Sequence, residues 1–214
     1  MTELKQALSH LVDDRNIMRP SWDETHMFRT IAAATRSSCL KRAVGAGLVR
    51  EKREIASGYS GAPEGVTTCL EHEYCYYEDL AWREAQKGNG QFEVLREQYK
   101  IYCTAVHAEA NALGQCSRFG TSAVGATLFI TNFPCPGCVR DHIITNKISE
   151  VRVWKQYLSN PLLVIDEKRE SERLLLQAGI SIKEIPLSDE RIMEIAFLMT
   201  RVGSRTSYTF KSFE

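Results

Sequence analysis

The segment His107-Ala108-Glu109 is followed further along the chain by Pro134-Cys135-Pro136-Gly137-Cys138. Together they supply one imidazole, one carboxyl group and two thiols at C-x-x-C spacing. Three protein ligands leave the fourth tetrahedral position of Zn²⁺ open for water, which is typical of catalytic zinc. Bound zinc lowers the pKa of that water toward about 7. We therefore predict a catalytic zinc held by His107, Cys135 and Cys138, with Glu109 as the catalytic carboxyl group.

The spacing of these residues predicts local structure as well as chemistry. Residues i and i+2 point to different sides of a regular helix, so His107 and Glu109 share a site only at a helix start. Pro136 is typical of the first turn of a second helix. Backbone N–H groups at such a start favour the thiolate forms of the two cysteines. The alternative, a closed structural zinc site, needs a fourth ligand and gives Glu109 no role.

Composition restricts the possible partners of the chain. It has 214 residues, 43% of them hydrophobic, and its 27 Lys and Arg balance 27 Asp and Glu. Zero net charge argues against binding to a polynucleotide, which needs a basic surface. A single phosphate needs only one or two fixed donors, such as Arg140, Lys155 or a backbone N–H group at a helix start. We therefore expect a small nucleotide as substrate.

The first residues are polar and lack a signal-peptide core, and no apolar run reaches transmembrane length. We expect no membrane association and a cytoplasmic location. Thiols stay reduced there, so clusters among the seven cysteines are expected to bind metal rather than form disulfides, while Cys116 is expected to pack in the core.

Hydrophobic periodicity predicts an α/β sheet with helices on both faces. Helices are expected over 21–37, 107–118, 136–145, 166–178 and 189–202, and strands over 44–49, 53–59, 126–131, 151–154 and 180–185. The capping box Ser21-x-x-Glu24 begins the first helix. A charged, partly helical stretch at about 67–103 reads as an insertion.

The H-x-E…P-C-x-x-C pattern resembles that of the cytidine/deoxycytidylate deaminase superfamily. The segments Arg19–Trp22, Arg36–Ala46 and Gly58–Gly65 resemble the deoxycytidylate (dCMP) deaminase branch in particular. This resemblance covers roughly residues 19–185. It implies a three-layer α/β/α cytidine deaminase-like fold with a central mixed sheet of about five strands. It also implies a homo-oligomer, with a hexamer favoured over a dimer or tetramer.

The resemblance divides the chain into three parts. They are an N-terminal extension (1–18), a zinc-dependent dCMP deaminase-like domain (19–185, with its insertion) and a C-terminal helix and tail (186–214). One position departs from the family, because Ser60 stands where the branch usually has Asn. That loop helps the family bind an allosteric deoxynucleoside triphosphate, so the departure puts such regulation in doubt.

A second zinc is implied by resemblance to bacterial late-competence deaminase-like proteins, which carry an extra cysteine-bound zinc. The matching residues are Cys39, Cys69, Cys75 and Cys103. His72 is a rival ligand between two of them. The alternative is that all four are small buried hydrophobic residues.

The reaction implied by the resemblance is hydrolytic deamination of dCMP to dUMP and ammonia. Asn111 is expected either to contact the substrate or to support the helix start, and Phe133 either to stack on the base or to pack in the core. Three alternatives stay open at this stage. They are deamination of another nucleotide (modified, triphosphate or purine), deamination of a polynucleotide, and a non-catalytic zinc-stabilised scaffold that binds a protein partner.

Overall fold

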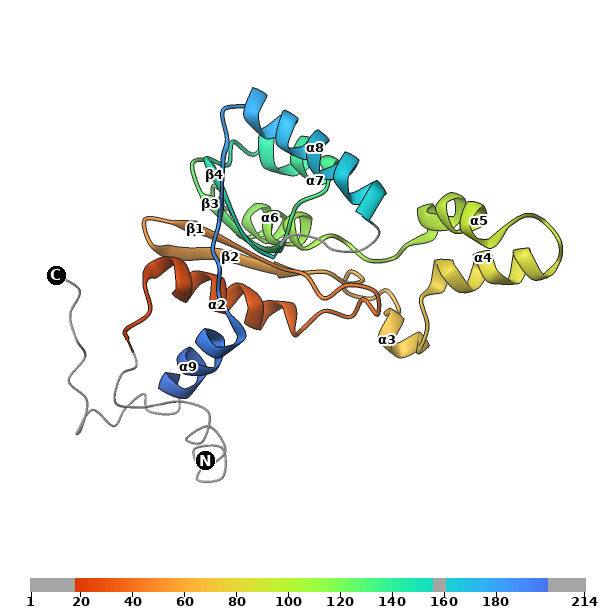
Figure 1. Ribbon diagram of the computed structural model, residues 1–214, viewed down its shortest axis with the longest axis horizontal. Helices are drawn as coiled ribbons and strands as arrows, with labels where there is room; N and C mark the ends of the chain where they lie inside the picture. The colour runs from red at the N-terminus through yellow and green to blue at the C-terminus, as the bar shows by residue number, and fades with distance from the viewer. Residues whose placement is uncertain (1–17, 156–160, 200–214) are drawn as a thin grey trace.

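The structure, a computed structural model, describes residues 18–155 and 161–199. A five-stranded sheet with the order β2-β1-β3-β4-β5 forms its centre (Figure 1). The strands are β1 (Gly45–Arg50), β2 (Arg53–Tyr59), β3 (Thr127–Asn132), β4 (Glu150–Lys155) and β5 (Ser181–Glu184). Strand β1 runs antiparallel to β2 and β3, whereas β3, β4 and β5 are parallel. The predicted mixed sheet of five strands is confirmed.

Helices cover both faces of this sheet, as predicted. One face carries α2 (Trp22–Ala34) and α9 (Asp189–Met199). The other carries α6 (Ala108–Arg118), α7 (Pro136–Cys138), its π-helical continuation η2 (Val139–Ile144) and α8 (Pro161–Gln177). The three-layer α/β/α architecture is therefore confirmed.

The two helical layers pack on alternate side chains of the same strands. Leu128 and Ile130 of β3 belong to the core beneath α6, while Phe129 between them belongs to the core beneath α2. Successive residues of a strand face opposite sides of a sheet, which explains this division. Helix α2 begins with the predicted capping box, since Ser21 and Glu24 each bond the other's backbone N–H.

The insertion (residues 67–103) folds into a helical lobe that projects away from the sheet (Figure 1). It contains α3 (Cys69–His72), α4 (Tyr76–Gln86), α5 (Phe92–Tyr99) and the 3-10 turn η1 (Lys100–Tyr102). Its connection to the body includes the ammonium group of Lys41. That group lies 2.8 Å from the Tyr77 hydroxyl and 2.5 Å from a Glu78 carboxylate oxygen.

Two predicted helices differ from the structure. Helix α8 begins at Pro161 rather than 166, because proline is well suited to a first turn. The second site helix changes to π-helical hydrogen bonding over Val139–Ile144, where a regular helix was expected. The predicted helix at 189–202 is described only to Met199, and the tail beyond it lies outside the described residues. Within the described ranges, no helix is long and apolar enough to span a membrane.

Candidate active site

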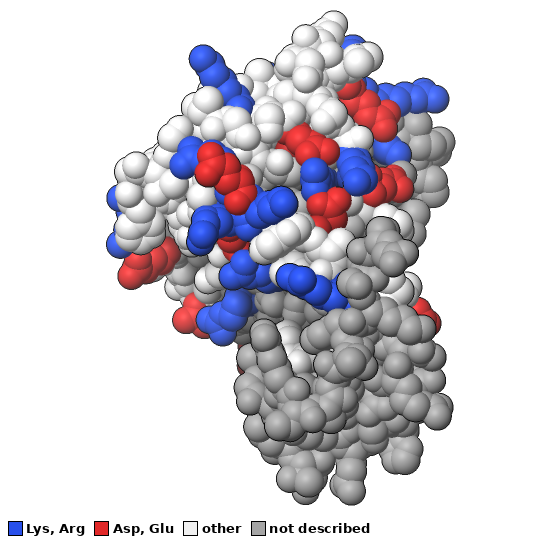
Figure 2. Space-filling view, turned by 90° about the vertical axis from the view of Figure 1, so that its left-hand side faces the viewer, with Lys and Arg blue, Asp and Glu red and all other residues white. Residues whose placement is uncertain are grey.

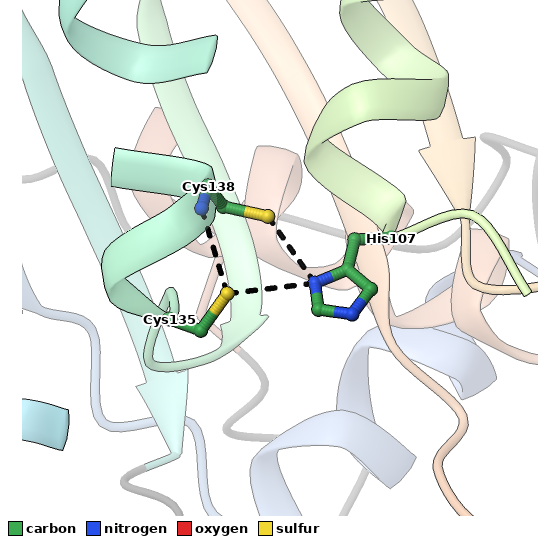
Figure 3. A group of neighbouring side chains, drawn as sticks. All are labelled: His107, Cys135 and Cys138. Atoms are coloured by element: carbon green, nitrogen blue, oxygen red, sulfur yellow. Dashed lines mark hydrogen bonds between the residues drawn. The ribbon is translucent and has the colours of Figure 1, made fainter. Parts of the chain in front are cut away.

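His107, Cys135 and Cys138 meet at the starts of helices α6 and α7 (Figure 3). Their potential ligand atoms all lie within 4.8 Å of one another. The Nδ1 atom of His107 is 3.2 Å from Cys138 Sγ and 3.6 Å from Cys135 Sγ. Nδ1 is therefore the ring nitrogen that faces the two sulfur atoms. These three residues are called the metal trio below.

Both helix starts follow from local sequence. His107 is the N-cap of α6 and has an extended backbone, so its side chain lies at the end of the helix. Cys135 is the N-cap of α7, its Sγ accepts the backbone N–H of Cys138 at 3.5 Å, and Pro136 occupies the first turn. The expectation that both halves of the site lie at helix starts is confirmed.

Close packing fixes α6 against the sheet. A Cβ atom at Gly58 of β2 would lie 2.4 Å from the backbone nitrogen of Ala112 and 2.5 Å from the backbone oxygen of Ala108. Only glycine permits this approach of helix to strand. Just before α6, Val106 and Gly61 exchange backbone hydrogen bonds of 2.8 and 3.2 Å. His107 therefore lies between two fixed segments, helix α6 packed on β2 after it and Val106 hydrogen-bonded to Gly61 before it.

The pKa values of the two cysteines are shifted in opposite directions. Hydrogen bonds from Cys138 and His107 lower the pKa of Cys135 to about 3, against the effect of burial. The same sulfur–sulfur contact and burial raise the pKa of Cys138. The hydrogen bond to Cys135 also raises the pKa of His107, although the charge of Arg42 acts in the opposite direction. A thiolate beside an imidazole and a second thiol is a donor set that suits Zn²⁺.

Glu109 lies beside the metal trio but is not one of its three donors. Its side chain is buried, with 3% of its surface exposed. Burial raises the pKa of this carboxyl group, while the charge of His107 opposes the shift. A buried carboxyl group with a raised pKa, next to a metal donor set, is a candidate proton carrier.

Comparison with known proteins agrees with this geometry. The family described as "Cytidine and deoxycytidylate deaminase zinc-binding region" matches residues 20–155. The chain belongs to the cytidine and deoxycytidylate deaminase family. Membership confirms the predicted family, the fold and the reaction class, zinc-dependent nucleotide deamination.

Two curated relatives are similar to most of this chain. ComE operon protein 2 of Bacillus subtilis is 30% identical over 177 residues, covering 83% of this chain and 77% of that protein. Deoxycytidylate deaminase of Saccharomyces cerevisiae is 34% identical over 187 residues, covering 84% of this chain and 51% of the yeast protein. This chain thus spans about half the length of the yeast relative.

Among solved structures, dCMP deaminase from the cyanophage S-TIM5, in complex with dCMP and dUMP, has the same fold. The TM-score is 0.57 at 24% identity, with 78% of this chain and 99% of that chain covered.

The two predicted substrate contacts lie near the deaminase site, and each has a partner within the protein. The amide nitrogen of Asn111 donates to the backbone oxygen of Tyr59 at 2.9 Å, which ties α6 to the end of β2. Phe133 packs against the core beneath α6, and the Lys168 ammonium lies 5.5 Å from the centre of its ring. These contacts account for a structural role of both residues, and their contact with substrate stays a prediction.

The four remaining predicted ligands do not come together as the metal trio does. Among the described residues, Cys39, Cys69, Cys75 and Cys103 form no group of three with donors as close as those of the trio. Cys69 is the first residue of α3 and Cys75 is the N-cap of α4. The two interact electrostatically, and burial raises the pKa of Cys75 to about 11. Cys103 is exposed. The second zinc therefore stays a prediction.

Some residues near the site were not predicted to have a role there. The hydroxyls of Ser37 and Ser60 lie 2.8 Å apart, and the Ser37 hydroxyl also bonds the Ser60 backbone oxygen at 2.7 Å. The departure of Ser60 from the family loop was the only signal in the sequence. Nothing in the spacing of the two serines indicates that they meet.

Proposed function

We propose that this protein deaminates dCMP hydrolytically to dUMP and ammonia. The observation that supports it best is the metal trio at two helix starts with a buried carboxyl group, Glu109, beside it. Relatives named deoxycytidylate deaminase in yeast and in Mycobacterium phage D29 support the choice of base and sugar. The intact carboxyl group argues against a non-catalytic scaffold.

In the proposed mechanism, His107, Cys135 and Cys138 hold a zinc ion, which when bound supplies an activated water. Glu109 takes a proton from this water and passes it to the ring nitrogen beside the amine-bearing carbon. The oxygen forms a bond to that carbon. Glu109 then takes the second proton from the newly formed hydroxyl group and delivers it to the amine, the C–N bond breaks, and ammonia leaves. A raised pKa suits a carboxyl group that must both accept and release protons.

A free mononucleotide is the proposed form of the substrate. The chain has no net charge, so it has no overall excess of cations to displace counterions from a long polyanion. On the face seen in Figure 2, both Lys and Arg side chains and Asp and Glu side chains are exposed.

A panel of substrates tests this proposal. Ammonia release would be measured with dCMP, deoxycytidine, dCTP and a single-stranded oligonucleotide under the same conditions, beside metal analysis of the enzyme. We expect dCMP to react fastest. Faster reaction of the oligonucleotide would overturn the substrate class, and no reaction of any cytosine compound would indicate a modified or purine nucleotide.

A symmetric homo-oligomer, with a hexamer favoured, and a cytoplasmic location are further parts of the proposal. The insertion displays many large apolar side chains to solvent, which supports burial in an assembly. They are Leu70, Tyr74, Trp82, Val94, Ile101 and Tyr102. Light scattering at micromolar concentration tests the assembly, and a fully active monomer would contradict it.

The last part of the proposal is a second zinc on Cys39, Cys69, Cys75 and Cys103. The proximity of Cys69 and Cys75 supports it. Elemental analysis of the pure protein should give two zinc ions per chain.

A further inference from the structure

Helix α8 lies beside the loop that leads from β3 to the metal trio. It connects the parallel strands β4 and β5, so it begins near the carboxyl ends of the strands, where this loop also begins. In Figure 1, α8 accordingly runs next to α7, and the two helices are in contact. The loop consists of Phe133 and Pro134 and leads directly to Cys135, the N-cap of α7.

Two side chains of α8, about one turn apart, contact the two residues of this loop. The Lys168 ammonium group lies 5.5 Å from the centre of the Phe133 ring. The Ser171 hydroxyl donates a hydrogen bond of 2.9 Å to the backbone oxygen of Pro134. Residues three apart share one face of a helix, so a single face of α8 contacts the whole loop.

The hydrogen bond between Ser171 and Pro134 is shielded from water. Ser171 has 0% of its surface exposed, and Pro134 is buried as well. A serine inside a helix can bond a backbone oxygen one turn earlier in its own helix, but its hydroxyl has only one hydrogen to donate. In Ser171 this hydrogen is given to a different segment. Because a buried backbone oxygen needs a partner, the bond restricts where Pro134 can lie.

The Pro134 oxygen belongs to the peptide unit that precedes Cys135. A peptide unit is planar, so fixing its oxygen also fixes its N–H group and the direction in which the chain enters Cys135. The Sγ atom of Cys135 accepts the backbone N–H of Cys138 at 3.5 Å and lies 3.6 Å from His107 Nδ1. The hydrogen bond from α8 therefore acts on a sulfur atom of the metal trio through one rigid unit.

We propose that Ser171 is a positioning residue for the metal trio, which holds Cys135 ready for the zinc ion through the Pro134 peptide. Groups that orient the ligands of a metal in this way contribute to metal affinity without touching the metal themselves. This inference rests on the metal trio of the proposed function, but it does not depend on which nucleotide is deaminated.

Zinc affinity tests this role without any substrate. Competition with a chelator of known affinity measures zinc binding, and the binding step that is missing in Cys135→Ser identifies the metal trio. We expect Ser171→Ala to lower the zinc affinity of the trio by about 10- to 100-fold, the effect typical of losing a group that orients a metal ligand.

Threonine and valine have nearly the same shape and differ in the hydroxyl group, so they form a matched pair at this position. Ser171→Thr should keep most of the wild-type affinity, whereas Ser171→Val should lose it as Ser171→Ala does. Leu175→Val is the control for the packing of α8, because Leu175 is buried about one turn further along the same face. It should lower stability in urea unfolding and leave the zinc affinity of the trio unchanged.

Three results would overturn the positioning role. They are an unchanged zinc affinity in Ser171→Ala, an affinity in Ser171→Thr as low as that in Ser171→Val, and a loss in Leu175→Val as large as that in Ser171→Ala. If threonine and valine prevent folding, the comparison of Ser171→Ala with Leu175→Val decides. A wild-type protein without zinc at the trio would overturn the proposed function as well. A wild-type protein that binds zinc there but does not deaminate dCMP would overturn the proposed function alone.

Discussion

Cys135 is the N-cap of α7 and Cys75 is the N-cap of α4, yet the pKa values of their thiols are shifted in opposite directions. Hydrogen bonds from Cys138 and His107 lower the pKa of Cys135 to about 3, whereas burial raises the pKa of Cys75 to about 11. The helix start is common to both cysteines, so it does not account for the difference. The difference comes from the two donors beside Cys135, which are Cys138 on its own helix and His107 at the start of α6.

The two regions around these cysteines differ in how they are supported. The metal trio lies on two helices that pack on the central sheet. The four cysteines of the predicted second site are distributed over a loop and the projecting insertion (Figure 1). In the sequence both groups resemble zinc sites. The structure brings the donor atoms of the first group within 4.8 Å of one another, and among the described residues it forms no such group from the second.

The largest expected effect concerns the carboxyl group beside the prearranged site. Glu109→Gln should keep the trio's zinc but lower kcat by about three to four orders of magnitude, because the amide cannot carry a proton. Ammonia release and elemental analysis on the same preparation measure both quantities. Normal turnover would exclude the proposed role, and loss of zinc would make Glu109 a ligand or a determinant of the fold.

A pair of cysteine variants then distinguishes the two regions. Cys135→Ser should remove one zinc and the activity. Cys75→Ser should remove one zinc and lower the free energy of unfolding by about 3 kcal/mol or more, because structural zinc contributes to folding. The corresponding drop in Tm is about 6–12 °C, while much of the activity remains at low temperature.

Calorimetry measures the Tm of these two variants, and elemental analysis measures their zinc content. If Cys75→Ser retains the zinc content of the wild type, the second site does not include Cys75. The insertion would then depend on its buried apolar side chains instead.

The next variant, Gly58→Ala, tests whether packing of α6 on the sheet holds the metal trio in place. Gly58→Ala should destabilise the protein by about 1–3 kcal/mol, because its Cβ would overlap the α6 backbone. Activity should fall as well, since α6 carries Glu109 in its first turn. Gly114→Ala is the control on the same helix, where a Cβ meets no atom within 4 Å and should stabilise by about 0.5–1 kcal/mol. Equal effects of the two variants in urea unfolding would contradict this account.

The sequence predicts the helix starts that carry the site residues, but few of the contacts that bring distant segments together around the site. His107 and Glu109 require a helix start because of their spacing, and Pro136 marks a second one, so both helix starts could be predicted. The fold was predictable because its strands and helices have distinct periodicities. The hydrogen bonds between Ser37 and Ser60 were not predictable, since the two residues are 23 apart in the chain and meet only after β1 and β2 have paired.

The cysteines illustrate the same limit. Residue type and spacing indicate that a thiol can bind metal, but its ionisation depends on which donors the fold brings near it. Cys138 lies on the same helix as Cys135, but His107 begins a different helix and meets Cys135 only in the folded chain. At the end of the π-helical turns that follow Cys138, the Thr145 hydroxyl donates to the backbone oxygen of Asp141 at 2.7 Å.

The smallest expected effect concerns the contact of Lys41 with the insertion. Although burial lowers it, hydrogen bonds to Glu78 and Tyr77 raise the pKa of Lys41 above its usual value. A raised folded-state pKa means that this stabilisation is fully present below the unfolded-state pKa, about 10.4, and is lost as the pH rises through the folded-state value. Lys41→Met should therefore destabilise by about 0.2–1 kcal/mol at pH 8, as expected for a partly exposed ion pair.

Above the folded-state pKa of Lys41, wild type and Lys41→Met should become equally stable. Lys87→Met is the control within the insertion, because the pair of Lys87 with Glu84 is more exposed and should contribute less. Urea unfolding at a series of alkaline pH values measures the difference. A difference that stays constant across the series would show that the Lys41 side chain stabilises the contact by packing on Tyr77 rather than by its charge, and the insertion would then be attached to the body by apolar contact alone.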